Sequence, residues 1–138
     1  MHAHGGVDML RAGVQGLEEG AHNAGLEPPQ SLAITVLTSD GDAPPHIMPK
    51  RVMLAAEAGC SGIVCAVGDL EEAHHYAPRL TRVTPGIRLS GDNADDQARA
   101  ASPGDALAGG SDLLVVGRAV TRADDPIAAA QAIHASAC

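Results

Sequence analysis

The sequence is nearly devoid of aromatic residues: Tyr76 is the only one, and the 138 residues include no Phe and no Trp. The chain therefore lacks platforms on which nucleic-acid bases could stack, and its core must be built from small aliphatic side chains. A net charge of −8 further argues against a broad nucleic-acid or anionic-membrane surface. A small anion remains compatible with this charge, because a few arginines and backbone amides can bind one phosphate locally.

Cysteine pairs and long apolar runs are also missing. Cys60, Cys65 and Cys138 form neither a Cys-x-x-Cys pair nor an even set, which favours reduced thiols. The longest apolar stretches, such as residues 113–116, are too short to span a bilayer, and the N-terminus shows no secretory signal. We therefore expect a cytoplasmic protein with no membrane partner and no nucleic-acid partner.

Helical and strand patterns alternate along the chain, and the strands are short apolar runs without alternation. This rhythm predicts an α/β fold in which helices cover a parallel sheet. Residues 1–4 stand where the end of one more strand is expected, which gives up to five βα units in one domain. The expected strands are 31–37, 62–67, 82–84 and 112–116, and the expected helices are 7–24, 46–58, 69–77, 102–108 and 124–136.

Several helix boundaries carry specific signals. Gly25 stands where a C-terminal glycine is expected, and Asp69 stands at the start of a helix, where it is expected to cap the first turn. Ser102 precedes a proline, as does Asp125, and both are expected as N-caps. Length limits the fold, since a complete (β/α)8 barrel needs roughly 200–250 residues. Five units therefore cannot close a barrel.

Ligands of parallel α/β sheets bind beyond the carboxyl ends of the strands. The residues expected there include glycines, which let backbone amides approach an anion, and arginines, which can hold phosphate oxygens by two hydrogen bonds. Arg88, Gln97, Gly117 and Arg118 are the candidates for a phosphate site. From spacing alone, turn glycines and solvated arginines are an equal alternative.

The order of these motifs resembles the orotidine 5′-phosphate decarboxylase family. The matching strings are His-Ala-His-Gly-Gly at residues 2–6, Leu-Thr-Ser at 37–39, Thr-Pro-Gly-Ile-Arg at 84–88, Asp-Gln at 96–97 and Val-Gly-Arg at 116–118. The resemblance covers essentially the whole chain. It implies an incomplete (β/α)8 TIM barrel, with residues 1–138 forming a single partial domain that corresponds to strands 4–8 of the family barrel.

The resemblance also implies an activity and its residues. Family members are carbon–carbon lyases that convert orotidine monophosphate to uridine monophosphate and CO2 in pyrimidine biosynthesis. They use no cofactor and no metal, and they work as homodimers with active sites at the subunit interface. The implied substrate-binding residues, with the phosphate held by Gln97, Gly117 and Arg118, are Thr38, Ser39, Pro85, Arg88, Gln97, Gly117 and Arg118.

The family's proton-donating lysine has no counterpart in the sequence. It belongs to an Asp-x-Lys-x-x-Asp motif that would lie upstream of Met1, and the single lysine, Lys50, stands mid-helix outside such a motif. Asp95 and Ala119 replace the family's usual Gly and Pro. We therefore expect no catalytic residue in this chain and no decarboxylation by the chain alone. Two alternatives stay open: a non-catalytic phosphate-binding or self-associating remnant, and a related sugar-phosphate barrel enzyme.

Other polar clusters are weaker candidates. His74 and His75 are adjacent on a helix and cannot chelate one ion, and residues 92–96 lack the glycine and distal glutamate of a calcium loop. Cys60 and Cys65 are expected to be small core residues. No metal site is expected.

Overall fold

The computed structural model describes residues 1–37, 39–40, 42–89 and 101–137. Its centre is a parallel sheet with the strands in chain order, β1-β2-β3-β4. The strands are β1 (Leu32–Ile34), β2 (Gly62–Val64), β3 (Thr81–Thr84) and β4 (Leu113–Leu114). The predicted parallel α/β architecture is confirmed, although each strand except β3 is shorter than predicted.

The N-terminus adds a fifth parallel position beside β1. His2 forms a parallel bridge with Ile34, and the terminal amine of Met1 donates to the Leu32 carbonyl at 2.8 Å. In return, the Ile34 amide donates to the Met1 carbonyl at 2.7 Å. The expectation that residues 1–4 end a further strand is thus confirmed for Met1 and His2, after which the chain enters the 3-10 turn η1 (Ala3–Gly5).

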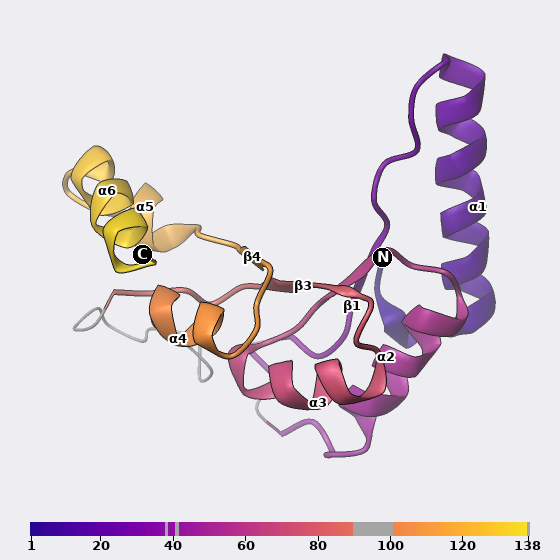
Figure 1. Cartoon of the computed structure of the whole chain (residues 1–138), viewed down its shortest axis with the longest axis horizontal. Coiled ribbons are helices and arrows are strands. Elements are labelled where there is room, and N and C mark those ends of the chain that lie inside the picture. The colour runs from indigo at the N-terminus through magenta and orange to yellow at the C-terminus, as the bar shows by residue number, and fades with distance from the viewer. Residues whose placement is uncertain (38, 41, 90–100, 138) are drawn as a thin grey trace.

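Helices follow each strand. They are α1 (Val7–Ala24), α2 (Ile47–Glu57), α3 (Leu70–Tyr76), α4 (Pro103–Ala108), α5 (Arg118–Thr121) and α6 (Pro126–Ser136), with a 3-10 turn η2 (Val67–Asp69) before α3. Figure 1 shows α1 at one end of the molecule, α5 and α6 at the other, and α2, α3 and α4 along one side of the strands. In the described part of the chain, no helix is long and apolar enough to cross a membrane.

The predicted helix boundaries hold with one correction. Gly25 ends α1 with a left-handed φ of 68°, the Ser102 Oγ accepts from the Asp105 amide at 3.1 Å, and Asp125 accepts from two amides of α6. Asp69 does precede α3, but it has helical backbone angles and its side chain makes no capping hydrogen bond. The prediction of a capping Asp69 is wrong because η2 runs directly into α3, so the residue is not in the extended conformation of a typical N-cap.

The two faces of the sheet differ in burial. Side chains alternate between faces along a strand, so register partners share a face. Ala33, Ile63 and Cys65 face the helices and are fully buried with Val52 and Ala55 of α2. The core is therefore made of aliphatic residues and two thiols, and the prediction that Cys60 and Cys65 are core residues is confirmed, because both are buried.

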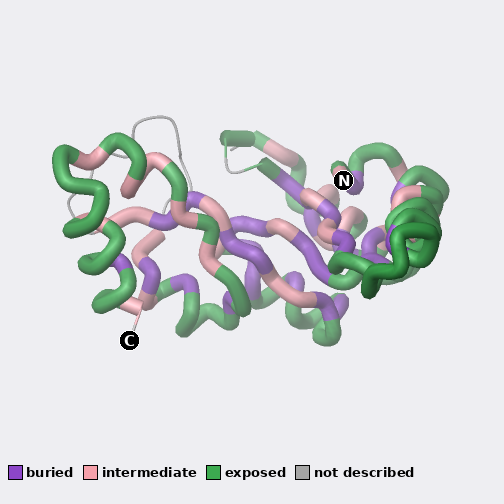
Figure 2. Tube along the Cα trace, turned by 90° about the horizontal axis from the view of Figure 1, so that it is seen from above, coloured by how far each residue is buried: buried purple, intermediate pink, exposed green. Residues whose placement is uncertain are grey.

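The opposite face, which we call the open face, is less covered. Leu32, Ile34 and Val64 are only partly buried, and Leu113 and Val115 near the β4 edge are 55% and 46% exposed. Figure 2 shows that buried residues are concentrated in the middle of the molecule and that exposed residues lie towards both ends. Within the described residues β4 pairs only with β3, so its other edge has no partner strand there.

Candidate active site at the carboxyl edge of the sheet

Two arginines stand at matching positions beyond neighbouring strands. Thr84 of β3 is the register partner of Leu114 of β4. Arg88 lies four residues after the first, and Arg118 lies four residues after the second. Because β3 and β4 are adjacent and parallel, both arginines follow the same edge of the sheet, where parallel α/β proteins bind ligands.

The segment that carries Arg88 is held at three points. Gly86 has a φ of 82°, a left-handed conformation that favours glycine, and Ile87 is fully buried. The Arg88 amide donates to the Ala101 carbonyl at 3.0 Å, and the Ala101 amide donates to the Gly86 carbonyl at 3.2 Å. This pairing fixes the backbone after Pro85, while the Arg88 guanidinium donates to the Ile87 carbonyl at 2.7 Å.

Arg118 opens a helix that the sequence did not reveal. Gly117 is the residue before α5 and is exposed, and Arg118, its first residue, is partly buried. Four residues are too few to show helical periodicity, which explains why α5 was missed. Gly117 accepts from the amides of Val120 and Thr121 through its carbonyl.

Of the four other predicted site residues, two lie within the described part of the chain and two lie outside it. Ser39 follows β1 and is exposed, and Pro85 follows β3 and is partly buried. Thr38 and Gln97 lie outside the described residues. The described site thus brings Pro85, Arg88 and Arg118 to adjacent strand ends, with Ser39 two strands away.

A third arginine lies near the end of β1. The Arg51 guanidinium, on α2, donates to the Thr35 carbonyl at 2.6 Å and lies 3.5 Å from Nδ1 of His4. It ties the end of β1 to the turn after the N-terminal strand position. No motif singled out Arg51, because its partners come from two distant segments.

An acidic hollow lies between the ends of β1 and β2, and the sequence did not predict it. It measures about 310 Å³ and is lined by three carboxylates, Asp40, Asp69 and Glu72, beside Val36, Ala43, Pro44, Pro45 and Met48. Three carboxylates disfavour an anion. The phosphate candidates therefore remain those on β3 and β4. Among the described residues, no group of three or more His, Cys, Asp or Glu side chains could hold a metal ion.

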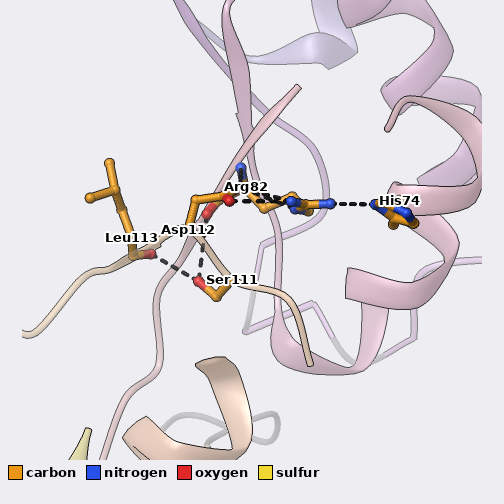
Figure 3. Close-up of polar contacts among 5 residues, drawn as sticks. All are labelled: His74, Arg82, Ser111, Asp112 and Leu113. Atoms are coloured by element: carbon orange, nitrogen blue, oxygen red, sulfur yellow. Dashed lines mark hydrogen bonds and ion pairs between the residues drawn. The ribbon is translucent and has the colours of Figure 1, made fainter. Parts of the chain in front are cut away.

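A polar network crosses the start of β3 and β4, away from the candidate site. Arg82 bonds Asp112 through its backbone amide and its guanidinium, and it lies 2.6 Å from Nδ1 of His74 (Figure 3). The amide and guanidinium hydrogen bonds lower the pKa of Asp112. This network therefore joins β3 to the residue before β4 near the amino ends of these strands, at the opposite edge of the sheet from the candidate site.

Comparison with known proteins connects this geometry to a family. A sequence model described as "Orotidine 5'-phosphate decarboxylase / HUMPS family" matches residues 1–133. The chain belongs to this family. Two relatives that are each named orotidine 5'-phosphate decarboxylase illustrate the similarity. The Bacillus pumilus protein is 38% identical to this chain over 144 residues, and the Thermobifida fusca protein is 40% identical over 146 residues.

These matches cover nearly all of this chain but only part of each relative. The Bacillus pumilus match covers 94% of this chain and 60% of the relative, and the Thermobifida fusca match covers 98% and 59%. A crystal structure of the Lactobacillus acidophilus orotidine 5'-phosphate decarboxylase superposes with a TM-score of 0.78 at 31% identity, covering 99% of this chain and 61% of that one. The chain therefore spans about three-fifths of the length of these family members.

The structural likeness also defines the fold. The Sulfolobus solfataricus orotidine 5'-monophosphate decarboxylase superposes with a TM-score of 0.70 at 20% identity, which supports the fold alone. A parallel sheet in chain order, covered on one face by helices and matched to about 60% of a TIM barrel, is a partial barrel. The predicted incomplete (β/α)8 barrel is confirmed for this family member.

Proposed function

We propose that this chain is the substrate-binding portion of an orotidine 5′-phosphate decarboxylase. In this proposal Arg88, Gln97, Gly117 and Arg118 hold the phosphate of orotidine or uridine monophosphate. The observation that carries it is the matched placement of Arg88 and Arg118, each four residues beyond its member of the Thr84–Leu114 register pair. Family membership and the names of the relatives support the same substrate.

The chemistry of these residues suits a phosphate. A guanidinium donates two parallel hydrogen bonds to phosphate oxygens and keeps its charge at any physiological pH. The net charge of −8 opposes anion binding at long range, so the site must act through contacts at short range. Two arginines on adjacent strand ends provide such contacts, and the exposed Gly117 leaves room for the ligand.

The nucleoside portion is assigned to the other predicted residues. Ser39 follows β1 and Pro85 follows β3, so these two residues border the same edge of the sheet as the arginines, and Thr38 is assigned with them as the neighbour of Ser39 in the sequence. We assign the pyrimidine ring to this part of the edge. Binding energy from the distant phosphate then positions the ring for reaction.

The chemical step requires groups that this chain does not supply. Loss of CO2 leaves a carbanion at C6 of the pyrimidine, which a nearby cation must stabilise and protonate. Lys50, the only lysine, is exposed on α2 and lies in no Asp-x-Lys-x-x-Asp motif. We therefore assign no catalytic residue to this chain and place the lysine array in the part of the family barrel that the matches leave out.

We further propose that the complete enzyme is a cytoplasmic homodimer. The resemblance implies that the complete enzyme is a homodimer, and the buried thiols of Cys60 and Cys65 suit a cytoplasmic setting. A phosphate-binding protein without decarboxylase activity is the second candidate, because the only lysine, Lys50, does not belong to an Asp-x-Lys-x-x-Asp motif. Activity of a complete barrel containing this chain separates the two.

Titration calorimetry with uridine monophosphate tests the phosphate assignment. We expect the chain to bind the nucleotide and Arg118→Ala or Arg88→Ala to weaken binding at least about tenfold, or roughly 1.4 kcal/mol. Arg79→Ala is the matched control, since Arg79 is exposed at the opposite end of β3 and should leave affinity unchanged. Equal losses in all three variants, or no binding by the unmodified chain, would overturn the assignment.

A further inference from the structure

Arg51 anchors the chain where it leaves β1. The last register pair of β1 and β2 is Ile34 with Val64. The next residue, Thr35, is 2% exposed, and both its amide, at 3.1 Å, and its hydroxyl, at 2.8 Å, donate to the Val64 carbonyl. The Thr35 carbonyl accepts from the Arg51 guanidinium at 2.6 Å. Every polar group of Thr35 is therefore paired, and the partner of its carbonyl comes from α2 rather than from a strand.

The same guanidinium reaches a second segment. Its other terminal nitrogen lies 3.5 Å from Nδ1 of His4, in the η1 turn that follows the Met1–His2 strand position. Arg51 thus bridges α2, the end of β1 and η1. Its neighbour Lys50 carries the same charge on the same helix, but its side chain is exposed to solvent. The two cations therefore have different surroundings, although they are adjacent in the sequence.

The anchored residue leads into a turn that contains a predicted site residue. Val36 is 4% exposed and belongs to the core cluster that includes residues of α2. The Leu37 carbonyl then accepts from the Asp40 amide at 3.0 Å, and Ser39 lies in the turn that this bond closes. The path from the Arg51 contact to the site is therefore short, because Ser39 follows closely after Thr35 in the chain.

Arg51 supplies a directional constraint that burial does not. Burial of Val36 holds the segment against the core, but the hydrophobic effect has no preferred direction. A hydrogen bond from a charged donor is directional, and it is stronger than one between neutral groups. Without it, the Thr35 carbonyl would have to turn towards another donor, and the chain that follows would turn with it.

We propose that Arg51 is a positioning residue for the pyrimidine-binding part of the site. By holding the Thr35 carbonyl, it sets the direction in which the chain enters the Leu37–Asp40 turn, and so where Ser39 meets the nucleobase. This inference rests on the proposed function, which assigns the pyrimidine ring to this part of the edge. The contacts of Arg51 lie at β1 and η1, whereas the phosphate arginines follow β3 and β4, so phosphate binding should not depend on it.

Two ligands that share a phosphate separate positioning from general stabilisation. Uridine monophosphate carries the nucleobase and ribose 5-phosphate lacks it, and titration calorimetry measures the affinity of the chain for each. We expect Arg51→Ala to weaken uridine monophosphate binding at least about fivefold and ribose 5-phosphate binding less than about twofold. Arg51→Lys keeps the charge but not the planar fork, so it should lose less affinity than Arg51→Ala.

Lys50→Ala is the matched control, because it removes the same charge one residue away from an exposed position. Both affinities should stay unchanged in this variant. If Arg51→Ala fails to fold, Arg51→Lys carries the same comparison between the two ligands. Unchanged uridine monophosphate affinity, or equal weakening of both ligands, would overturn the positioning role.

Hydrogen exchange at the Asp40 amide tests the positioning without a ligand. This amide closes the turn by donating to the Leu37 carbonyl, so its exchange should be at least about threefold faster in Arg51→Ala and unchanged in Lys50→Ala. Exchange at the parent rate in Arg51→Ala would contradict the role of Arg51 in the turn. Failure of the parent chain to bind uridine monophosphate would overturn the proposed function and the nucleobase contact, while the exchange rates still decide whether Arg51 positions the turn.

Discussion

Arg82 fastens the edge strand β4 to β3 by holding the carboxylate of Asp112. Its amide donates to Asp112 Oδ2 at 2.8 Å, and its guanidinium donates to Oδ2 at 3.1 Å and to Oδ1 at 3.2 Å. Ser111 adds a bond from its hydroxyl to the Leu113 carbonyl at 3.1 Å. Because β4 has only two residues in the sheet, these bonds position the strand that leads to Gly117 and Arg118.

Removing this carboxylate should lower the stability of the chain. Asp112→Ala leaves the Arg82 amide and guanidinium without their acceptor, and Arg82 is only 14% exposed. We expect a loss of about 1 kcal/mol in the free energy of unfolding by urea, since Asp112 itself is 43% exposed and solvent screens part of the interaction. Asp8→Ala is the control, because the Asp8–Arg11 pair is on the surface with Asp8 95% exposed. A change within about 0.5 kcal/mol is expected there.

The same pair predicts a pH dependence. The pKa of Asp112 in the folded chain lies below its ordinary value of 3.8, because it accepts hydrogen bonds from Arg82. A depressed carboxyl pKa stabilises the fold above the unfolded pKa, and this stability is lost as the pH falls below about 4 through the folded pKa. The difference in urea midpoint between the parent and Asp112→Asn should therefore be largest at pH 5–7 and shrink towards pH 3. A difference in urea midpoint that stays constant from pH 7 to pH 3 would contradict a lowered pKa for Asp112.

Two glycine substitutions should have opposite effects. A Cβ at Gly62 would lie 2.5 Å from the Thr81 carbonyl oxygen and 2.9 Å from the Leu32 side chain, so Gly62→Ala must push β2 and β3 apart. We expect about 2 kcal/mol of destabilisation. Gly16 of α1 has nothing within 4 Å of the added Cβ, and Gly16→Ala should stabilise the helix by about 0.5–1 kcal/mol. Thermal and urea unfolding of both variants measures the signs, and destabilisation by both would contradict this description of the packing.

Local signals allowed most of the fold to be predicted. The α1 boundary at Gly25 and the starts of α4 and α6 follow from glycine and capping residues, which act over one helical turn. Strands β1, β2 and β4 were predicted too long, because an apolar run continues past the last residue that pairs with a neighbour. Asp69 was misassigned as a cap because the short turn η2 before α3 leaves no periodic pattern.

The candidate site was predictable only where a motif carried it. Pro85, Arg88 and Arg118 belong to short strings that the family resemblance highlights, and they follow adjacent strands in the structure. Arg51 and the acidic hollow depend on contacts between segments far apart in sequence, such as Arg51 with Thr35 and His4. Such contacts produce no recognisable spacing of residues in the sequence, so they can be identified only in the folded structure.

The chain alone should not turn over substrate. Loss of orotidine monophosphate absorbance can be followed with the purified 138-residue chain at high concentration. We expect no decarboxylation above background, because the sequence offers no lysine–carboxylate array for the carbanion. A rate comparable to that of a full-length relative would show that this chain contains the catalytic groups after all.

Assignment of the amide resonances of the isotopically labelled chain during titration with uridine monophosphate tests the central claim most directly. The claim places the phosphate beyond β3 and β4, so the amides of Arg88, Gly117 and Arg118 should shift together and saturably. Inorganic phosphate should shift the same amides more weakly. Shifts centred on the acidic hollow of Asp40, Asp69 and Glu72, or no saturable shift at the two arginines, would contradict it.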